Sequence, residues 1–378
     1  MTRRHPVTIS REQLREDWAT TASNLRWLFP VLLILGVLMA FAASLLGAGA
    51  RRLPEAWSIT VGAPAFAAWS PEGIAVVYVT SGDGRILWVK SGGLLAHSQE
   101  LGGRRVLGLS PHGVATGNGT TLQVYGSSAQ GTTLPIRGEP AHVFLCGNIQ
   151  VLARPVLEPH GVLGDHLEIV TGSERWTITL AASAAIGAAR VGDGVLVTTL
   201  STVGDRIQAG LSMLSRDKTS WQVPLGERLP AGPVSLPGGA VVAVGDLVKA
   251  YTHQGAEMWT YRLPGDVDAL EGAGSGVLVG VAVRSLLGNY RHQVIYLDYQ
   301  GNRRWSVTVG GPVEQLHGDD HTVAVLAKGL LWLVDVTTGK AGRFSATDVT
   351  WVAVDSRTQE VVTLTTSGEI RGLRLPGR

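Results

Sequence analysis

Between residues 54 and 378 the chain alternates short apolar runs with turn-forming residues. Most runs are five to eight residues long, and Gly, Pro, Asn or Asp stand between consecutive runs. These residue types accept or impose the backbone angles of tight turns. Regularly spaced runs of this kind predict β-strands joined by hairpins, and therefore an all-β domain.

A longer period lies over this alternation, in which an apolar strand and a turn are followed by Trp four residues after Gly. The pattern is complete in three segments, 167–180, 248–263 and 294–309. It is altered in two others, where Asp217 takes the glycine position and Arg343 takes the tryptophan position. A period of about 40 residues with four strands in each unit predicts a β-propeller.

Counting strands predicts eight units. Seven complete units run from Pro64 to about Ser345, and only three strands remain in 348–375. An orphan strand at Trp57–Val61, in the sequence EAWSITV, supplies the fourth. We therefore predict an eight-bladed β-propeller in which the N-terminal strand closes the last blade, because closure removes the exposed strand edges of an open ring.

Ahead of the repeats lies an apolar segment, 27–50, without a charged residue. As a helix it would be about 36 Å long, enough to cross a hydrocarbon core of about 30 Å. We therefore divide the chain into a tail (1–26), one transmembrane helix (27–50) and the propeller (54–378). The alternative is a cleaved signal peptide, since Ala48–Ala50 fits a cleavage site, but the apolar run is longer than such peptides usually have.

Arginines around this segment predict its orientation. Five of them precede the segment and two, Arg51 and Arg52, follow it. The excess of positive charge before a membrane helix normally stays inside the cell. We expect a single-pass protein of the cell membrane, with its N-terminus in the cytoplasm and the propeller outside.

The tail itself carries a helix signal. Ser10 and Gln13 fit a capping box, and apolar residues follow at helical spacing. A short amphipathic helix on the inner membrane surface is one interpretation, and a loosely ordered tail is the other.

Composition and charge argue against nucleic-acid binding and against cysteine-based sites. Net charge is +2, too close to zero for a nucleic-acid-binding protein, and only 5 of the 32 basic residues are Lys. This preference for Arg, with abundant Ala and Gly, suggests a bacterial source with a GC-rich genome. Cys146 is the single cysteine, so the chain has no internal disulfide or Cys-x-x-Cys site, and we expect a buried, inert residue.

The strand, the D-x-x-G-like turn and the Trp together resemble the PQQ-like repeat, which occurs in quinoprotein dehydrogenases and BamB-like propellers. The resemblance covers residues 54–378 and implies that the glycines form turns and the tryptophans pack between blades. The adjacent cysteines and the Ca²⁺ ligands of the quinoprotein enzymes have no counterpart here, nor does the lipoprotein cysteine of BamB. The resemblance therefore implies a binding scaffold without a cofactor or catalytic activity.

Two polar stretches could bind a metal ion. One is LHGDDH, with His317, Asp319, Asp320 and His321, and the other is EPHGVLGDH, with His160, Asp165 and His166. Polar turns are the simpler interpretation, because a tight hairpin rarely brings four side chains together. The acidic stretch 265–272 does not fit a calcium loop, and no catalytic fingerprint occurs. We predict no metal site and no catalytic residue.

Two connections between the second and third strands of a unit are long, 154–166 and 284–293. Connections of this type leave a propeller on the same face, and insertions gathered on one face often bind partners. The candidate partner-binding residues are Arg154, Glu158, His160, Arg284, Asn289, Tyr290, Arg291 and His292. Arg, aromatic and polar side chains are typical of interfaces, although such loops can also lack a partner.

Three functions are compatible with these features. The first is a protein-interaction scaffold tethered to the outer face of the membrane, and the fold, the anchor and the absent motifs all favour it. The second is a sensor that binds a small ligand, for example in the central channel. The third is a quinoprotein-type enzyme, for which the specific residues are missing. We expect the first.

Overall fold

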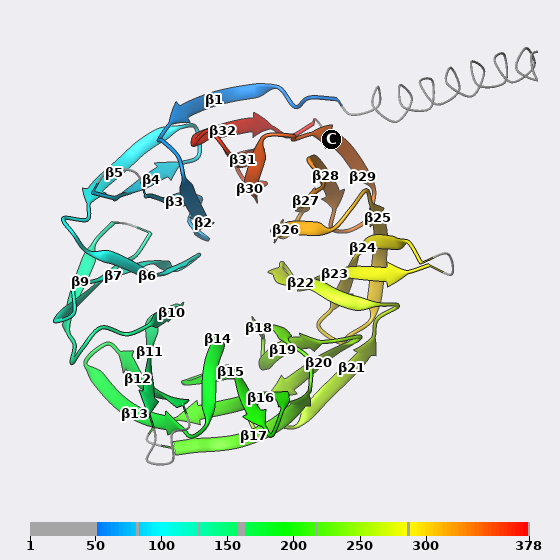
Figure 1. Cartoon of the computed structure of the whole chain (residues 1–378). Helices are drawn as coiled ribbons and strands as arrows, with labels where there is room; N and C mark the ends of the chain where they lie inside the picture. Colours follow the sequence, from blue (N-terminus) through cyan, green and yellow to red (C-terminus); the bar gives the residue numbers. More distant parts are fainter. Residues whose placement is uncertain are drawn as a thin grey trace, which may run out of the picture. The chain divides into compact units, whose positions relative to one another are not determined.

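The structure is a computed structural model that describes residues 51–80, 83–127, 129–157, 163–216, 218–285 and 288–376. In these ranges the chain forms 32 β-strands, grouped in eight four-stranded antiparallel sheets. The sheets are arranged around a central channel as the blades of a propeller (Figure 1). The predicted all-β, eight-bladed propeller is confirmed.

Each blade runs from an inner strand a to an outer strand d. Blade 1 contains β2 (Ala65–Trp69), β3 (Ile74–Val79), β4 (Arg85–Lys90) and β5 (Leu94–Glu100); blade 2 contains β6 (Arg105–Ser110), β7 (Gly113–Gly117), β8 (Thr121–Tyr125) and β9 (Gly131–Pro135); blade 3 contains β10 (His142–Cys146), β11 (Ile149–Leu157), β12 (Leu163–Thr171) and β13 (Glu174–Leu180); blade 4 contains β14 (Ser183–Val191), β15 (Gly194–Val203), β16 (Arg206–Ser215) and β17 (Lys218–Gly226).

The second half of the ring follows the same order. Blade 5 contains β18 (Pro230–Leu236), β19 (Gly239–Val244), β20 (Leu247–Thr252) and β21 (Glu257–Arg262); blade 6 contains β22 (Asp266–Ala273), β23 (Gly276–Arg284), β24 (Tyr290–Asp298) and β25 (Arg303–Val309); blade 7 contains β26 (Val313–Gly318), β27 (Thr322–Ala327), β28 (Leu330–Asp335) and β29 (Ala341–Ser345); blade 8 contains β30 (Val349–Asp355), β31 (Glu360–Thr365), β32 (Glu369–Arg374) and, as its strand d, β1 (Glu55–Thr60).

Blade 8 joins the two ends of the propeller. Strand β1 pairs antiparallel with β32, with Ser58 opposite Arg371. The indole N–H of Trp57 also donates to a carboxylate oxygen of Glu360 in β31, at 3.1 Å. The predicted closure by the N-terminal strand is confirmed, and the strand begins at Glu55, two residues before the predicted start.

The hydrophobic core lies between neighbouring blades. The b strands are the most buried elements, and all six residues of both β19 and β31 are buried. In contrast, the outer strands alternate between exposed and covered residues, as in β21. A strand that is buried on both faces has a continuous apolar sequence, whereas an outer strand buried on one face alternates apolar and polar residues.

Tryptophans of the repeat connect several neighbouring blades. The indole N–H of Trp259 donates to the carbonyl of Tyr299 in the c–d turn of the following blade, at 2.7 Å. Gly301 lies under the ring, where an added Cβ would be 2.6 Å from a ring carbon. Trp221 and Trp305 donate to the next blade in the same way. Inter-blade packing, implied by the PQQ-like resemblance, is confirmed for these residues.

Arg343 stands at a position where other repeats have Trp, and the sheet topology explains this exception. A tryptophan at this position of β29 would dock on the c–d turn of blade 8. That turn does not exist, because β32 and β1 come from opposite ends of the propeller sequence. Arg343 instead lies over the ring of Trp332 in its own blade, 5.9 Å from the ring centre.

The predicted tail and membrane helix, residues 1–50, lie outside the described residues. Within the described ranges we find no helix of the length and hydropathy that a membrane crossing needs.

Candidate functional site

Three b–c hairpins are longer than the others. Strands b and c have nine residues each in blades 3 and 6, ten each in blade 4, and five or six in the remaining blades. Strand β15 is buried over its first six residues and exposed over its last two, so its end leaves the core. All b–c turns and d–a connections lie at the same end of the disc, and we call this end the hairpin face.

Exposed apolar side chains gather at the hairpin face. Ten large apolar side chains are exposed in the described ranges, and six of them lie at or near this end, namely Phe66, Val156, Val203, Ile207, Leu229 and Tyr290. The most accessible of the six keep about two thirds of their surface, and Val203 and Tyr290 are 60% and 62% exposed. Exposed apolar groups concentrated in one region are a mark of interaction surfaces.

In blade 6 the predicted residues lie at the tip of a hairpin. The structure corrects the bounds of the predicted loop 284–293, because β23 continues to Arg284 and β24 begins at Tyr290, which pairs with it. Only residues 285–289 connect the strands, and Asn289 accepts a backbone hydrogen bond from Ser285 at 2.7 Å. Backbone pairing beyond the core explains the difference, since two extended strands satisfy each other's polar groups.

A groove of about 540 Å³ runs beside this hairpin. It is lined by Tyr290, Arg291 and His292 of β24, the connection 309–312, and Glu314 and Lys328 of blade 7. The Nδ1 atom of His292 lies 3.1 Å from a carboxylate oxygen of Asp268, which orients the ring. Arg291 and Lys328 form no ion pair with any described residue. The groove thus combines an exposed aromatic ring with two cations that have no ion-pair partner among the described residues.

Arg154 has a different environment. Its guanidinium group donates to Glu168 at 2.7 Å, and Arg175 binds the other oxygen of the same carboxylate at 2.9 Å. The Arg154 side chain is 15% exposed and belongs to β11, so its visible role is an internal ion pair. The predicted loop 154–166 is also shorter than expected, since β11 extends to Leu157 and β12 starts at Leu163. Glu158 and His160 lie outside the described residues.

The blade 4 hairpin was missed by the sequence analysis. Its turn consists of Gly204 and Asp205 alone, so loop length gives no signal. The available signal is the length of the paired strands, because β15 and β16 stay in register from Val195 to Val203. Reading strand length as well as loop length would have found all three long hairpins.

The LHGDDH stretch forms a turn at the opposite end of the disc. Asp319 accepts hydrogen bonds from the backbone N–H groups of His321 and Thr322, at 2.9 and 2.8 Å, as a polar turn requires. His317 accepts one from the backbone of Val354 through Nδ1, at 3.1 Å. Among the described residues no group of three or more His, Cys, Asp or Glu side chains is placed to hold a metal ion.

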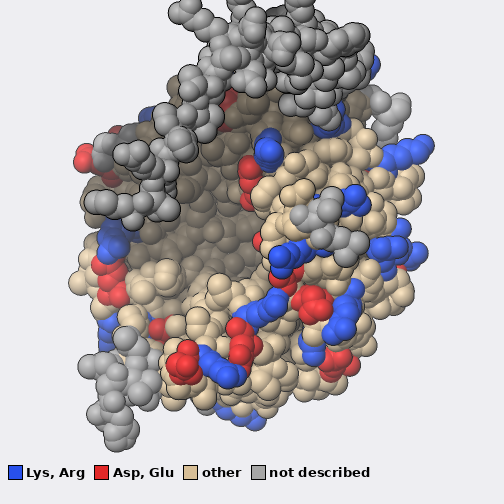
Figure 2. Space-filling model, turned by 45° about the vertical axis from the view of Figure 1, so that its right-hand side comes forward, with Lys and Arg blue, Asp and Glu red and all other residues tan. Residues whose placement is uncertain are grey.

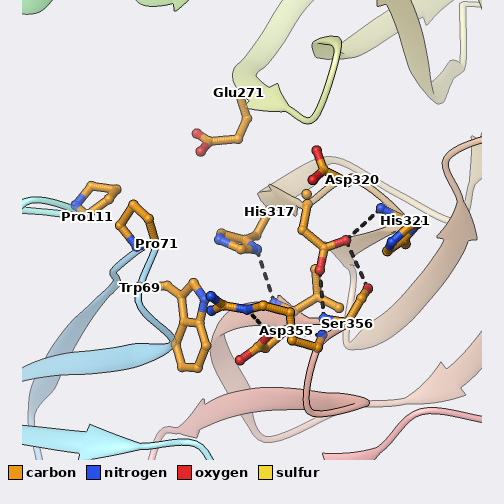
Figure 3. Close-up of a pocket in the computed structure, with 13 residues that line it drawn as sticks. Trp69, Pro71, Pro111, Glu271, His317, Asp320, His321, Asp355 and Ser356 are labelled. Atoms are coloured by element: carbon orange, nitrogen blue, oxygen red, sulfur yellow. Dashed lines mark hydrogen bonds and ion pairs between the residues drawn. The ribbon is translucent and has the colours of Figure 1, made fainter.

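The same turn lines a pocket of about 380 Å³ where inner strands of five blades end (Figure 3). We call it the channel pocket, and its residues are Trp69, Pro71, Pro111, Glu271, 317–321 and 354–357. Sequence analysis treated 265–272 and 317–321 as separate stretches. The structure brings them together because both belong to inner strands or a–b turns that face the channel.

The remaining candidates have structural roles. Asp165 is buried and accepts a hydrogen bond from the backbone of Ala185 at 2.7 Å. His166 lies 3.2 Å from the hydroxyl of Thr179. Burial raises the pKa of Cys146 to about 12, so its thiol stays protonated at neutral pH, in agreement with an inert residue.

Charge is mixed on the face of the molecule that Figure 2 shows. In the view of Figure 2, basic and acidic side chains alternate on the outer wall around a hollowed centre. This wall carries no continuous basic stripe of the kind that nucleic-acid-binding surfaces show.

Comparison with known proteins identifies the fold. The chain resembles BamB from Moraxella catarrhalis, with 13% identity and a TM-score of 0.52, over 85% of this chain and 100% of that one. It also resembles apo AztD from Citrobacter koseri, with 12% identity and a TM-score of 0.51, over 77% of this chain and 88% of that one. The likeness is one of fold. The predicted resemblance to BamB-like propellers is therefore confirmed at that level. Models of known protein families and curated protein sequences give no match.

Proposed function

We propose that this protein is a protein-interaction scaffold that binds its partner through the hairpin face. The observation that carries the proposal is the set of three projecting hairpins with exposed apolar residues near their tips, including Val203 and Tyr290. A large apolar side chain in water gains free energy when a partner covers it, about 1.5–3 kcal/mol for complete burial. Aromatic and Arg side chains supply most of the binding energy in many interfaces.

The groove of blade 6 gives this face a specific feature. Tyr290 offers an apolar surface, and Arg291 and Lys328 offer positive charge that no described residue pairs with. A partner segment with an apolar anchor beside an acidic residue would satisfy both. A propeller suits this task because a rigid ring holds its connecting turns at fixed positions.

We further propose that residues 27–50 hold the propeller at the outer face of a bacterial cell membrane. The apolar segment and the preceding arginines support this location and orientation. A protease added to intact spheroplasts should digest the propeller and spare the N-terminal tail. Protection of the propeller would place it on the cytoplasmic side.

Site-specific photo-crosslinking in living cells tests the interaction. A crosslinking residue is placed at Val203, at Tyr290 or, as a matched control, at Leu94, which is 63% exposed on the outer strand β5. A discrete adduct is expected from the first two positions and not from Leu94. Equal yields from all three positions, or no adduct from any, would contradict the proposal.

A further inference from the structure

The channel pocket contains acidic side chains of two kinds. Asp319 accepts two backbone hydrogen bonds within its own turn and two more from Ser356, at 2.7 Å from the backbone N–H and 2.9 Å from the hydroxyl. Hydrogen bonds to a carboxylate compensate for the water that it loses on burial. Asp319 therefore has no need of a ligand.

Asp355 is satisfied in a similar way. Its carboxylate accepts hydrogen bonds from the guanidinium of Arg357 and from the hydroxyl of Ser91, both at 3.0 Å. These contacts hold the pKa of Asp355 below its usual value although burial opposes them. Arg357 is the only Lys or Arg among the residues that line the pocket, and it forms its ion pair with Asp355.

Glu271 is the exception. It lines the pocket from β22 of blade 6 and stands apart from Asp355 and Ser356 of blade 8 (Figure 3). It makes no hydrogen bond or ion pair with any residue that the structure describes. Protein surrounds most of the side chain, and this burial raises its pKa to about 7. Asp320, which is exposed on the a–b turn of blade 7, is also without a partner among these residues.

His317 does not balance the negative charge of a carboxylate in this pocket. Its Nδ1 accepts a hydrogen bond from a backbone N–H, so a neutral ring carries its proton on Nε2. Burial lowers the pKa of His317 to about 4, and the ring is neutral at physiological pH. Near pH 8 the pocket therefore presents the ionised carboxylate of Glu271 beside Asp320, and the only Lys or Arg among its described lining residues is Arg357, which is paired with Asp355.

We propose that the channel pocket binds an ammonium or guanidinium group, with Glu271 and Asp320 as its carboxylate acceptors. The pocket volume, about 380 Å³, accommodates a small amine or the end of a Lys or Arg side chain. Trp69 and the prolines of the blade 1 and blade 2 turns form the apolar wall on the opposite side. The ligand is either a free amine or a basic side chain of a protein, since both present the same chemistry.

This site is separate from the proposed interaction face. The channel pocket is built from a–b turns and the ends of inner strands, whereas the hairpin face consists of b–c turns at the other end of the disc. The two proposals can therefore fail independently. An anionic ligand is disfavoured here, because it would meet two unpaired carboxylates.

Calorimetric titration of the full-length protein in detergent with two probes tests the proposal. Agmatine represents a free amine, and the blocked tripeptide Ac-Gly-Arg-Gly-NH₂ represents a protein side chain. EDTA is present so that metal ions do not contribute. Saturable binding at pH 8 is expected, at least tenfold weaker in Glu271→Gln and unchanged in Glu100→Gln, which alters an exposed acid on β5. Binding of agmatine alone assigns the site to free amines, and binding of the tripeptide assigns it to protein side chains.

The dependence on pH separates this site from nonspecific attraction. With a pKa of about 7, Glu271 is about one-tenth ionised at pH 6 and about nine-tenths ionised at pH 8, so affinity should rise about tenfold over this range. The other titratable groups facing the pocket are His317, Asp319, Asp320, His321, Asp355 and Arg357, with Glu72 and His112 on the adjoining turns. Glu271→Gln should remove most of the rise. Absence of saturable binding by both probes, or equal binding by wild type and Glu271→Gln, would overturn the proposal.

Discussion

The two ends of the propeller use the same eight-fold scaffold in opposite ways. At the hairpin face, strands continue past the core and leave apolar residues such as Val203 in water. At the channel pocket, the turns are short and polar groups converge, and most of them satisfy one another. One end thus has exposed apolar side chains, and the other has a carboxylate, Glu271, that no described residue pairs with.

This difference shows which features of a repeat protein indicate its binding sites. The repeated features, such as the buried b strands of all blades and the docked tryptophans of several, explain the ring and give no information about ligands. The departures from the repeat are what distinguish the two ends. In blades 3, 4 and 6 the departure is strand length, and in blade 6 it also includes an acidic residue on an inner strand.

The largest effect is expected from opening the ring. Deleting residues 54–62 removes β1 and with it the pairing to β32 and the contacts of Trp57. The deletion removes the buried Val61 and the half-buried Trp57; losing large core side chains typically costs several kcal/mol, and exposing a strand edge adds to that. We expect the melting temperature to fall by at least about 10 °C, measured by differential scanning fluorimetry.

Trp57→Phe serves as the control for this deletion. It keeps the strand and removes the hydrogen bond to Glu360, at a cost of about 1 kcal/mol. The deletion should impair crosslinking at the hairpin face and amine binding in the channel pocket together, because both depend on the closed ring. A deletion variant that melts like the wild type would refute closure by β1.

The second-largest effect is expected from substitutions at the hairpin face, which should impair partner binding and leave the channel pocket intact. Replacing Val203 and Tyr290 by Ser at the hairpin tips is expected to reduce the recovered partner adduct more than tenfold, with the crosslinker at Ile207. Because both side chains are exposed, the melting temperature should change by less than about 2 °C. Agmatine binding should be unchanged. If partner adduct and amine binding fell together, the two ends would not be independent.

A smaller effect concerns stability and pH. The folded pKa of Glu271, about 7, lies above its unfolded value near 4.5, so the folded state binds the proton more tightly. Its contribution to stability is complete below about pH 4.5 and is lost as pH rises through 7. Glu271→Gln removes this dependence, and its melting temperature relative to wild type should increase by roughly 1–2 °C between pH 6.5 and pH 8.

The chosen pH window avoids an opposing effect from His317. Its folded pKa is about 4, below the usual 6.5, so its contribution is lost as pH falls from about 6.5 toward 4. Above pH 6.5 the imidazole of His317 is mostly neutral in the folded and the unfolded protein. Glu271 then accounts for most of the change in stability with pH. A constant gap between Glu271→Gln and wild type from pH 6.5 to 8 would show that Glu271 is ionised throughout.

The fold was predictable because its signals are local. The spacing of Gly and Trp predicted a propeller, and the count of short apolar strands predicted eight blades closed by the strand at Trp57. The site was less accessible to sequence reasoning. Glu271 and Asp320 come together only through the closed ring, and a search along the sequence sees each as an isolated polar stretch. The blade 4 hairpin was overlooked because its length lies in paired strands and not in its turn.

The smallest effect should come from the charge pair on the blade 4 hairpin. Arg206 and Glu227 form an ion pair at 2.9 Å with both side chains largely exposed. Exposed pairs contribute about 0–1 kcal/mol, whereas β15 and β16 pair from Val195 to Val203 through their backbones. Glu227→Gln should therefore shift the melting temperature by less than about 2 °C and leave crosslinking at Val203 unchanged. A loss of crosslinking would mean that the ion pair, and not strand pairing, holds the hairpin in its projecting position.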